Sequence, residues 1–324
     1  MRAAITPRYG PPSILQLTEK TPPTIGEEDV LVAVHASPVT AGDRRIRAAD
    51  YPGASMLLGR LMMGLTGPRQ PVQGTMFAGR VLAVGAGVTR FAVGDDVFGS
   101  VDFGAYADQL VVSAHGPVAK MPSGTSHVDA AATPYGAGTA LHFLRDLADV
   151  QAGESVLILG ASGGVGRHAV QIAKHLGAEV TAVCSQPALA LVTRLGADHV
   201  IDHAAEDFTA SGRCYDVIFD VADASSFRHC RDALTPTGRY LTLYISLQAL
   251  AATGWTALVG GKRAIFAIAL GEQARTEALR DLLAQRVIRP VIAEQFPLEA
   301  VADAHTLAET GIHGEVMIVV TGEA

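Results

Sequence analysis

Residues 160–166, with the sequence GASGGVG, have the composition of a turn that binds phosphate. Glycines let the backbone approach a phosphate closely, and the free N–H groups of a following helix bind its negative charge. The run 156–159 before the turn is typical of a strand, and 167–176 has helical spacing. Arg167 could reach the phosphates or be a solvated helix residue, and we expect the second. Ser162 stands where GxGxxG has glycine, so the turn alone does not identify the ligand. We expect contacts from Gly160, Ala161, Ser162, Gly163, Gly164, Val165 and Gly166.

The context of this turn indicates a dinucleotide. A second strand pattern at 179–184 follows the helix, so the turn lies within a βαβ unit. An acid at the end of that strand would bind the ribose 2′-hydroxyl of NAD, and its absence leaves room for a 2′-phosphate. Here Ser185 and Gln186 follow the strand and could donate hydrogen bonds to phosphate, with His203 and Arg194 as candidate charged neighbours. The sequence therefore favours NADPH, although Ser185 could also simply cap the next helix.

The composition argues against several classes of protein. The chain has 324 residues, 49% hydrophobic and 18% charged, as in a globular protein of about two domains. Its formal net charge of −7 argues against binding to nucleic acid. Cys184, Cys214 and Cys230 are too few and too irregularly spaced for a disulfide framework or a CxxC metal site. We expect no signal peptide and no membrane span, and therefore a soluble cytoplasmic protein.

The pattern of predicted strands and helices divides the chain into two parts, and the second contains the glycine turn. Short strand patterns at 30–35, 80–84 and 109–112 predict a β-barrel-like unit. From about Val128, strands alternate with helices, which predicts a doubly wound parallel sheet of the α/β class. The tail from Pro290 returns to strand, helix and strand, and should pack on the first unit. The predicted domains are residues 1–125 with 289–324, and a nucleotide-binding domain at 126–288.

Five stretches distributed over nearly the whole length carry a common set of motifs: residues 94–99, 134–141, 153–174, 195–202 and Gly238-Arg239. Together they resemble the quinone oxidoreductase and ζ-crystallin branch of the medium-chain dehydrogenase/reductase superfamily. The resemblance implies a catalytic domain with a GroES-like barrel, a Rossmann domain inserted before its C-terminal part, and a substrate cleft between them. It also implies a homodimer, and the apolar run 264–270 at the end of the sheet is suited to pairing of two sheet edges.

The same resemblance bears on zinc, because many members of the superfamily are zinc alcohol dehydrogenases. Catalytic zinc needs three protein ligands from Cys, His or acid. At the matching positions this chain has Thr40 in place of cysteine and Thr75-Met76 in place of a His-Glu pair. The third ligand is missing near Tyr135, and the four-cysteine structural lobe has no counterpart. The resemblance therefore implies an enzyme without a metal.

Without a Lewis acid, the acceptor must need little activation. Transfer of a hydride from NADPH to a quinone or to the β-carbon of an enone fits, because conjugation spreads the developing charge. By resemblance, Tyr51 occupies the position of a tyrosine proposed as proton donor in related enoyl reductases, and Thr40 lies where zinc-free relatives often have asparagine. Tyr51 could instead be a turn aromatic beside Pro52. The apolar segment 54–65 is either a flap over a cleft or a short core helix.

The resemblance also places three further residues beside the cofactor, namely Thr139, Val221 and Leu243. Three functions stay open at this point. The first is an NADPH-dependent, zinc-free reductase of quinones or α,β-unsaturated carbonyl compounds. The second is a zinc-independent dehydrogenase of simple alcohols or aldehydes. The third is an NADPH-binding sensor protein with little turnover.

Overall fold

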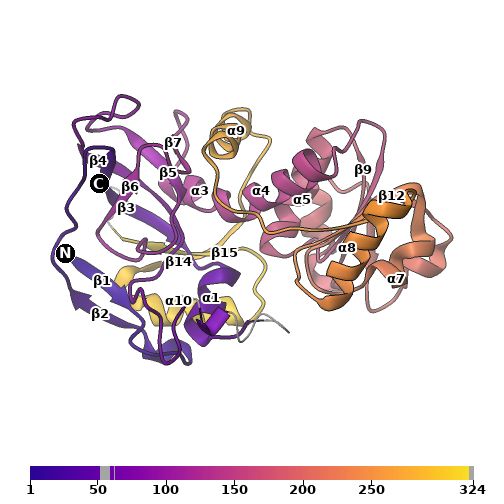
Figure 1. Cartoon of the computed structure of the whole chain (residues 1–324), viewed down its shortest axis with the longest axis horizontal. Helices are drawn as coiled ribbons and strands as arrows, with labels where there is room; N and C mark the ends of the chain where they lie inside the picture. Colours follow the sequence, from indigo (N-terminus) through magenta and orange to yellow (C-terminus); the bar gives the residue numbers. More distant parts are fainter. Residues whose placement is uncertain (52–58, 62, 321–324) are drawn as a thin grey trace. The chain divides into compact units, whose positions relative to one another are not determined.

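The computed structural model describes residues 1–51, 59–61 and 63–320 (Figure 1). Within them the chain forms two compact units. The barrel unit comprises residues 1–51, 59–61, 63–138 and 271–320, and the nucleotide unit comprises residues 139–270. The barrel unit is therefore built from both ends of the sequence, and the nucleotide unit is the segment between them.

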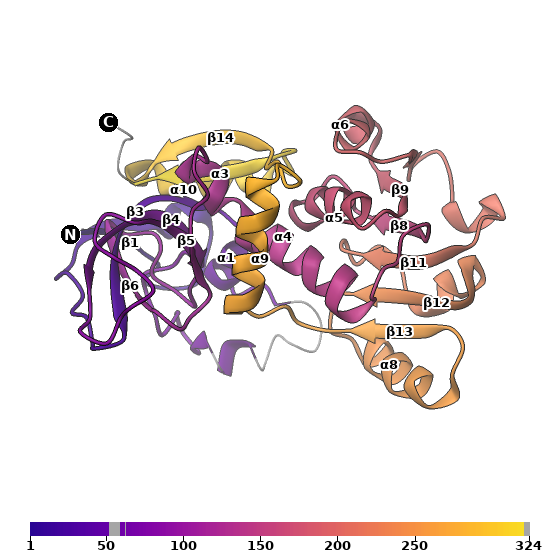
Figure 2. The same cartoon turned by 90° about the horizontal axis from the view of Figure 1, so that it is seen from above.

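The main sheet of the barrel unit has strand order β14-β15-β3-β4-β5-β7, and β6 also pairs with β3. Alternate residues of β3 point into the core, where Val30, Val32 and Val34 are fully buried. The C-terminal strand β15 pairs antiparallel with β3, so the end of the chain completes this sheet (Figure 2). The strands are β3 (Asp29–Pro38), β4 (Met76–Val84), β5 (Asp96–Ser100), β6 (Gln109–Ser113), β7 (Val118–Lys120), β14 (Ile292–Pro297) and β15 (Glu315–Val319).

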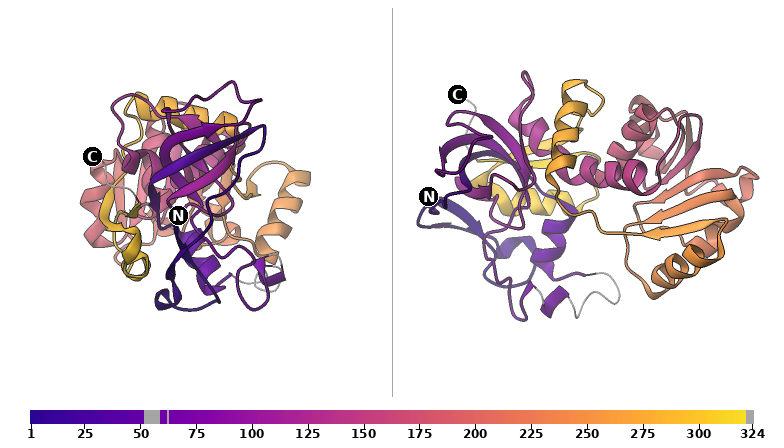
Figure 3. Two further views of the ribbon diagram at one scale, coloured as in Figure 1. Left: turned by 90° about the vertical axis from the view of Figure 1, so that its left-hand side faces the viewer. Right: turned by 45° about the horizontal axis from the view of Figure 1, so that its top comes forward.

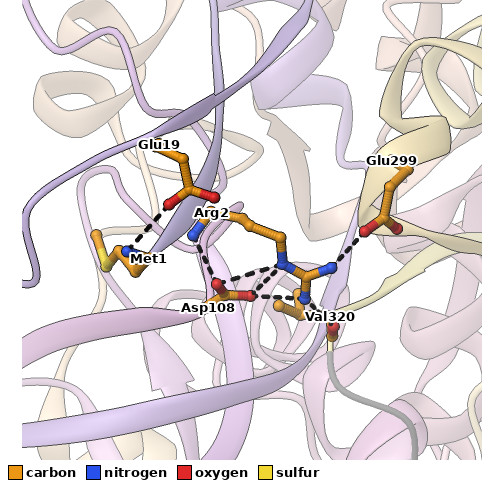
Figure 4. Close-up of polar contacts among 6 residues, drawn as sticks. All are labelled: Met1, Arg2, Glu19, Asp108, Glu299 and Val320. Carbon is orange, nitrogen blue, oxygen red and sulfur yellow. Dashed lines mark hydrogen bonds and ion pairs between the residues drawn. The ribbon is translucent and has the colours of Figure 1, made fainter.

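Smaller elements complete the barrel unit. A hairpin of β1 (Arg2–Ile5) and β2 (Gln16–Glu19) carries Arg2, whose guanidinium Nη2 lies 2.8 Å from Asp108 Oδ1 and 3.2 Å from the Val320 carbonyl oxygen (Figure 4). Arg2 also pairs with Glu299, so one side chain joins both ends of the chain. The helices are α1 (Ala41–Ala48), α3 (His127–Ala131), α4 (Thr133–Leu141), α9 (Gln273–Ala284) and α10 (Val301–Glu309), of which α4 crosses into the nucleotide unit.

The nucleotide unit is a parallel sheet with order β10-β9-β8-β11-β12-β13 (Figure 3). Numbered along the sequence, these strands have the order 3-2-1-4-5-6, which is the doubly wound order. All strands are parallel, and the direction in which successive strands are added to the sheet changes between β8 and β11. The fully buried Leu157 and Ile218 come from these two central strands. The elements are β8 (Ser155–Leu159), α5 (Gly164–His175), β9 (Glu179–Cys184), α6 (Leu189–Arg194), β10 (His199–Asp202), β11 (Tyr215–Asp220), α7 (Phe227–Cys230), β12 (Leu234–Thr242), α8 (Leu247–Val259) and β13 (Arg263–Phe266).

The predicted fold class is confirmed: an α/β chain with a parallel Rossmann sheet and a barrel unit. The boundaries differ from the predicted 126 and 288, because α9 packs against β7 and its Glu277 pairs with Arg90 at 2.6 Å. After β7 the chain forms α3, α4 and then a π-helical turn at His142–Leu147. Half of the predicted flap or helix at 54–65 falls outside the described residues, and residues 59–61 and 63 are helical. No helix in the described part of the chain is both long and apolar enough to cross a membrane.

Candidate functional site

The glycine turn lies at the point where the parallel sheet reverses its strand order. Gly160 follows β8 with φ of +80°, a left-handed conformation that glycine adopts without strain. Helix α5 begins at Gly164 and not at Arg167, as the sequence had suggested, so the last glycines of the motif form its first turn. A Cβ on Gly166 would lie 2.2 Å from the Gly160 carbonyl oxygen. The close approach of helix and turn therefore requires glycine, and it leaves the N–H groups of the helix start available for phosphate.

Arg167 corrects the expectation of a solvated helix residue. Only 3% of Arg167 is exposed, and its Nη1 donates a hydrogen bond of 2.7 Å to the Ser162 carbonyl oxygen. The earlier start of α5 places this side chain back over the turn, where it ties the first turn of the helix to the glycine motif. Arg167 is thus part of the structure that shapes the cradle.

A pocket of about 690 Å³ opens beside the turn at the carboxyl ends of the strands. Of the residues predicted to bind the cofactor, Gly160, Ser162, Ser185 and His203 meet in its lining. This brings the end of β8 together with the ends of β9 and β10, as expected for a ligand at the switch point of a doubly wound sheet. The lining is completed by residues that were not predicted: Leu159, Val183, Cys184, Ala204, Ala205, Glu206, Asp207, Phe208, Ala222 and Ala224.

The charge of this lining was not foreseen from the sequence. Glu206 and Asp207 are acids, and within the described residues no lysine or arginine lines the pocket. Among the described lining residues, His203 alone has a side chain that can carry a positive charge. Arg194, suggested as a charged neighbour, is not among the lining residues. Any electrostatic attraction for a 2′-phosphate inside this pocket would therefore come from His203 and from the backbone.

Ser185 was also a candidate helix cap, and the other residues predicted to contact the cofactor lie outside the pocket lining. Ser185 precedes the short helix Gln186–Ala188 but makes no side-chain capping bond, so its hydroxyl is not used as a cap. Gln186 is exposed and does not line the pocket. Val221 and Leu243 directly follow β11 and β12 at the same edge of the sheet, but neither lines the pocket. The same holds for Thr139, which lies in α4, and for Ala161, Gly163, Gly164, Val165 and Gly166, which form the turn and helix behind it.

In the barrel unit, Thr40 is already engaged in a buried network. Its Oγ1 donates to Asp43 Oδ2 at 2.5 Å and accepts a bond from the Asp43 N–H at 3.1 Å. Asp43 Oδ2 also accepts a bond of 2.9 Å from the Thr40 N–H, which completes a capping box at the start of α1. Thr75 Oγ1 donates to the other oxygen, Asp43 Oδ1, at 3.1 Å. Burial raises the pKa of Asp43, while these hydrogen bonds oppose the rise. The hydroxyl proton of Thr40 is thus committed to Asp43.

Asp43 was missed in the sequence, although the spacing of Thr40 and Asp43 is that of a capping box. The structure shows that two positions matched to zinc ligands, Thr40 and Thr75, both bond to this one carboxylate. Among the described residues, no group of three or more His, Cys, Asp or Glu side chains is placed to hold a metal ion.

Tyr51, the other catalytic candidate, is half-buried and has a buried hydroxyl. The neighbouring Tyr9 hydroxyl donates its own proton to the Gly64 carbonyl oxygen at 2.7 Å. No acceptor in the described part of the chain forms a hydrogen bond of normal geometry with Tyr51 Oη. Burial, reinforced by Tyr9, raises the pKa of Tyr51 to about 12, so the phenol keeps its proton at neutral pH.

Two parts of the chain match families of protein domains. Residues 26–123 match the alcohol dehydrogenase GroES-like domain, and residues 195–314 match the zinc-binding dehydrogenase family. The human protein named NAD(P)H oxidoreductase RTN4IP1, mitochondrial, is 31% identical over 345 aligned positions, which cover 96% of this chain and 87% of that protein. The pikromycin polyketide synthase component PikAII of Streptomyces venezuelae is 35% identical over 230 positions, 68% of this chain and 6% of its own length.

Solved structures extend the similarity to both units. The quinone oxidoreductase from Coxiella burnetii has a TM-score of 0.86 at 27% identity and covers 99% of each chain. The Escherichia coli quinone oxidoreductase complexed with NADPH has a TM-score of 0.82 at 24% identity, covering 99% of this chain and all of that one, which shows a shared fold. The similarity therefore includes the glycine turn as well as the barrel.

Proposed function

Since the chain belongs to the medium-chain dehydrogenase/reductase superfamily, among its quinone oxidoreductase-like members, and is a nicotinamide-dependent oxidoreductase, we propose that it reduces a quinone or an α,β-unsaturated carbonyl compound with NADPH. The observation that carries the proposal is the pocket of about 690 Å³ at the switch point of the sheet, beside a turn that requires glycine at positions 160 and 166. When bound there, the nicotinamide cofactor supplies the hydride.

The chain's own groups bind and orient the cofactor. The turn 160–166 and the first N–H groups of α5 suit the pyrophosphate, because Gly166 lets the helix approach the turn and the helix dipole favours negative charge. Ser185 and His203 suit the 2′-phosphate of NADPH, since both line the pocket beyond the ends of β9 and β10. The acid-free end of β9 supports NADPH over NADH.

The preference for NADPH should be modest, because Glu206 and Asp207 line the same pocket and oppose the phosphate charge. A pair of variants tests this. His203→Arg places a permanent charge at the pocket and should raise the ratio of kcat/KM for NADPH to that for NADH about tenfold. His203→Gln should lower the same ratio severalfold. Equal ratios in both variants and the wild type would remove His203 from the proposal.

For the acceptor, we propose that Tyr51 Oη donates a hydrogen bond or proton to the carbonyl oxygen where negative charge develops. Its raised pKa keeps that proton in place, and its hydroxyl is buried beside Tyr9. Thr40 has the different role of fixing the start of α1 through Asp43. Neither role needs a metal, which fits a conjugated acceptor and a zinc-free enzyme.

The direct test is an NADPH oxidation assay with quinones, enones, and simple aldehydes, each run with and without a chelator. Turnover of quinones or enones that the chelator leaves unchanged is the expected result. Turnover only with aldehydes, or loss of activity in chelator that zinc restores, would overturn the proposal. Tight NADPH binding with no turnover of any acceptor would favour a sensor protein.

We also propose that the protein is a homodimer paired through the edge of the nucleotide unit. Strand β13 is the last strand of its sheet, and α8 packs beside it (Figure 2). The apolar side chains exposed on and after these elements include Trp255 at 67%, Leu258 at 84% and Leu270 at 75%. Such a surface suits a second copy of the same edge. Light scattering should give twice the chain mass of 33.7 kDa, and a monomer mass would dismiss the dimer.

A further inference from the structure

The loop 221–226, between β11 and α7, forms one wall of the cofactor pocket. Its residues Ala222 and Ala224 line the pocket. A Cβ on Gly160 would meet the Ala222 Cβ at 2.6 Å, so the loop lies directly against the glycine turn. Asp223 has φ of +56°, which is uncommon for a residue other than glycine. The loop is therefore held tightly in one conformation, and something outside it must fix that conformation.

Asp220, at the end of β11, supplies the fixing contacts. It is fully buried, and its Oδ1 accepts hydrogen bonds from the N–H groups of Ala222 and Ala224, both at 3.1 Å. Its Oδ2 accepts a bond of 2.8 Å from the Ser225 N–H and one of 3.0 Å from the Tyr240 hydroxyl. Burial and the charge of Asp220 raise the pKa of Tyr240 well above its ordinary value, so the phenol stays a donor. Four donors thus converge on one carboxylate.

A carboxylate is the side chain that this arrangement requires. Both of its oxygens only accept, so they can satisfy three loop amides and a phenol at the same time. An amide side chain would turn its NH₂ group toward two of these donors. The backbone N–H groups of the loop offset the free-energy cost of burying the Asp220 carboxylate. The charged hydrogen bonds in turn hold the loop in place.

We propose that Asp220 is a positioning residue that holds loop 221–226 as a wall of the dinucleotide pocket, and so sets the affinity for the part of the cofactor that NADH and NADPH share. The inference rests on the proposed use of this pocket for a dinucleotide. Asp220 acts through the loop backbone and does not line the pocket itself. Its loss should weaken both cofactors by the same factor, unlike a change at His203.

The test compares Asp220→Asn with Asp232→Asn, the same chemical change at an exposed site of the nucleotide unit. In the protein without nucleotide, amide hydrogen exchange at Ala222, Ala224 and Ser225 should become at least about tenfold faster in Asp220→Asn. The Kd values for NADPH and for NADH, from fluorescence titration, should both rise about tenfold, with their ratio unchanged. Asp232→Asn should match the wild type in both measurements.

Several outcomes would overturn the role of Asp220: an unchanged Kd in Asp220→Asn, a changed ratio between the two cofactors, or faster exchange spread over the whole unit. If Asp220→Asn does not fold, Tyr240→Phe serves instead, because it leaves the carboxylate and removes one donor. It should change exchange at Ser225, which shares Oδ2, by two- to threefold, and no change there would also overturn the role. Failure of the wild type to bind either nucleotide would instead overturn the proposed function.

Discussion

The cofactor pocket of the nucleotide unit and the catalytic candidates of the barrel unit are built from different kinds of group. In the pocket, the turn 160–166 presents backbone N–H groups, and glycines create the space. In the barrel unit, the candidates Tyr51 and Thr40 are side chains with distant residues in their surroundings: Tyr9 lies beside Tyr51, and Thr75 bonds to the same Asp43 carboxylate as Thr40. A site made of backbone is encoded locally by glycine spacing, whereas a site made of side chains depends on which hydrogen bonds they already make.

The largest expected effect tests the backbone side of this comparison. Gly166→Ala puts a methyl group 2.2 Å from the Gly160 carbonyl oxygen and 2.7 Å from the Ala161 Cα, so turn and helix must separate. We expect the Kd for NADPH, measured by fluorescence titration, to rise at least about 100-fold, since close backbone approach to the pyrophosphate is lost. Gly254→Ala in α8 is the matched control, because a Cβ there meets nothing within 4 Å. Unchanged binding in Gly166→Ala would show that the turn does not hold phosphate.

The next effect tests the side-chain half. Tyr51→Phe should lower kcat/KM for an enone by about 100-fold if the phenol acts as general acid, with the Kd for NADPH unchanged. Tyr9→Phe is the control, because it removes the neighbouring hydroxyl and leaves Tyr51 in place. Full activity of Tyr51→Phe would reduce Tyr51 to an aromatic that covers the barrel, and the contrast between the two sites would then rest on the pocket alone.

The success of the sequence-based predictions follows the same division. The parallel sheet and the glycine turn were predicted because strand alternation and glycine spacing are local signals. The role of Arg167 was predicted wrongly, because its burial depends on α5 beginning at Gly164. Residues Ala222 and Ala224 gave no signal, since an alanine in a loop is informative only once Asp220 has folded that loop against Gly160.

The barrel unit shows where sequence reasoning stops. Thr40 could be matched to a position in the family, and its capping-box spacing to Asp43 is a local signal, but the bond from Thr75 to the same carboxylate comes from tertiary packing. Likewise α9 follows the nucleotide unit in sequence yet belongs to the barrel unit, because the pair of Glu277 with Arg90 joins it to a distant strand connection. Contacts of this kind leave no periodic pattern.

A smaller effect separates structural from catalytic roles within the barrel unit. Thr40→Val removes the cap of α1 and one donor to the buried Asp43. The free energy of unfolding in urea should fall by about 2 kcal/mol. The Kd for NADPH should stay the same, and Thr40→Ser, which keeps the hydroxyl, should restore most of the stability. If Thr40→Val kept wild-type stability but lost turnover, Thr40 would regain the catalytic role suggested by the family resemblance.

The smallest expected effect is the pH dependence of stability that one buried histidine causes in each unit. Burial lowers the pKa of His168 in the nucleotide unit to about 4, and burial with the charges of Arg47 and Arg44 lowers that of His305 in the barrel unit to about 3. In the unfolded chain a histidine binds its proton near pH 6.5. The unfolded state therefore takes up protons first as the pH falls, so stability present above pH 6.5 is lost between about pH 6.5 and 3 to 4.

Each histidine should remove about 1 kcal/mol of stability between pH 6.5 and 5.5. His168 Nδ1 donates to the Gly164 carbonyl oxygen at 2.8 Å, and Gln at this position can replace that donor without titrating. Between pH 6.5 and 5.5, the free energy of unfolding of His168→Gln should therefore fall by less than that of the wild type, by about that amount. Urea unfolding at both pH values measures this difference. An equal fall in His168→Gln and wild type would mean that His168 accepts its proton in the folded state, and the nucleotide unit would then tolerate acid better than the barrel unit.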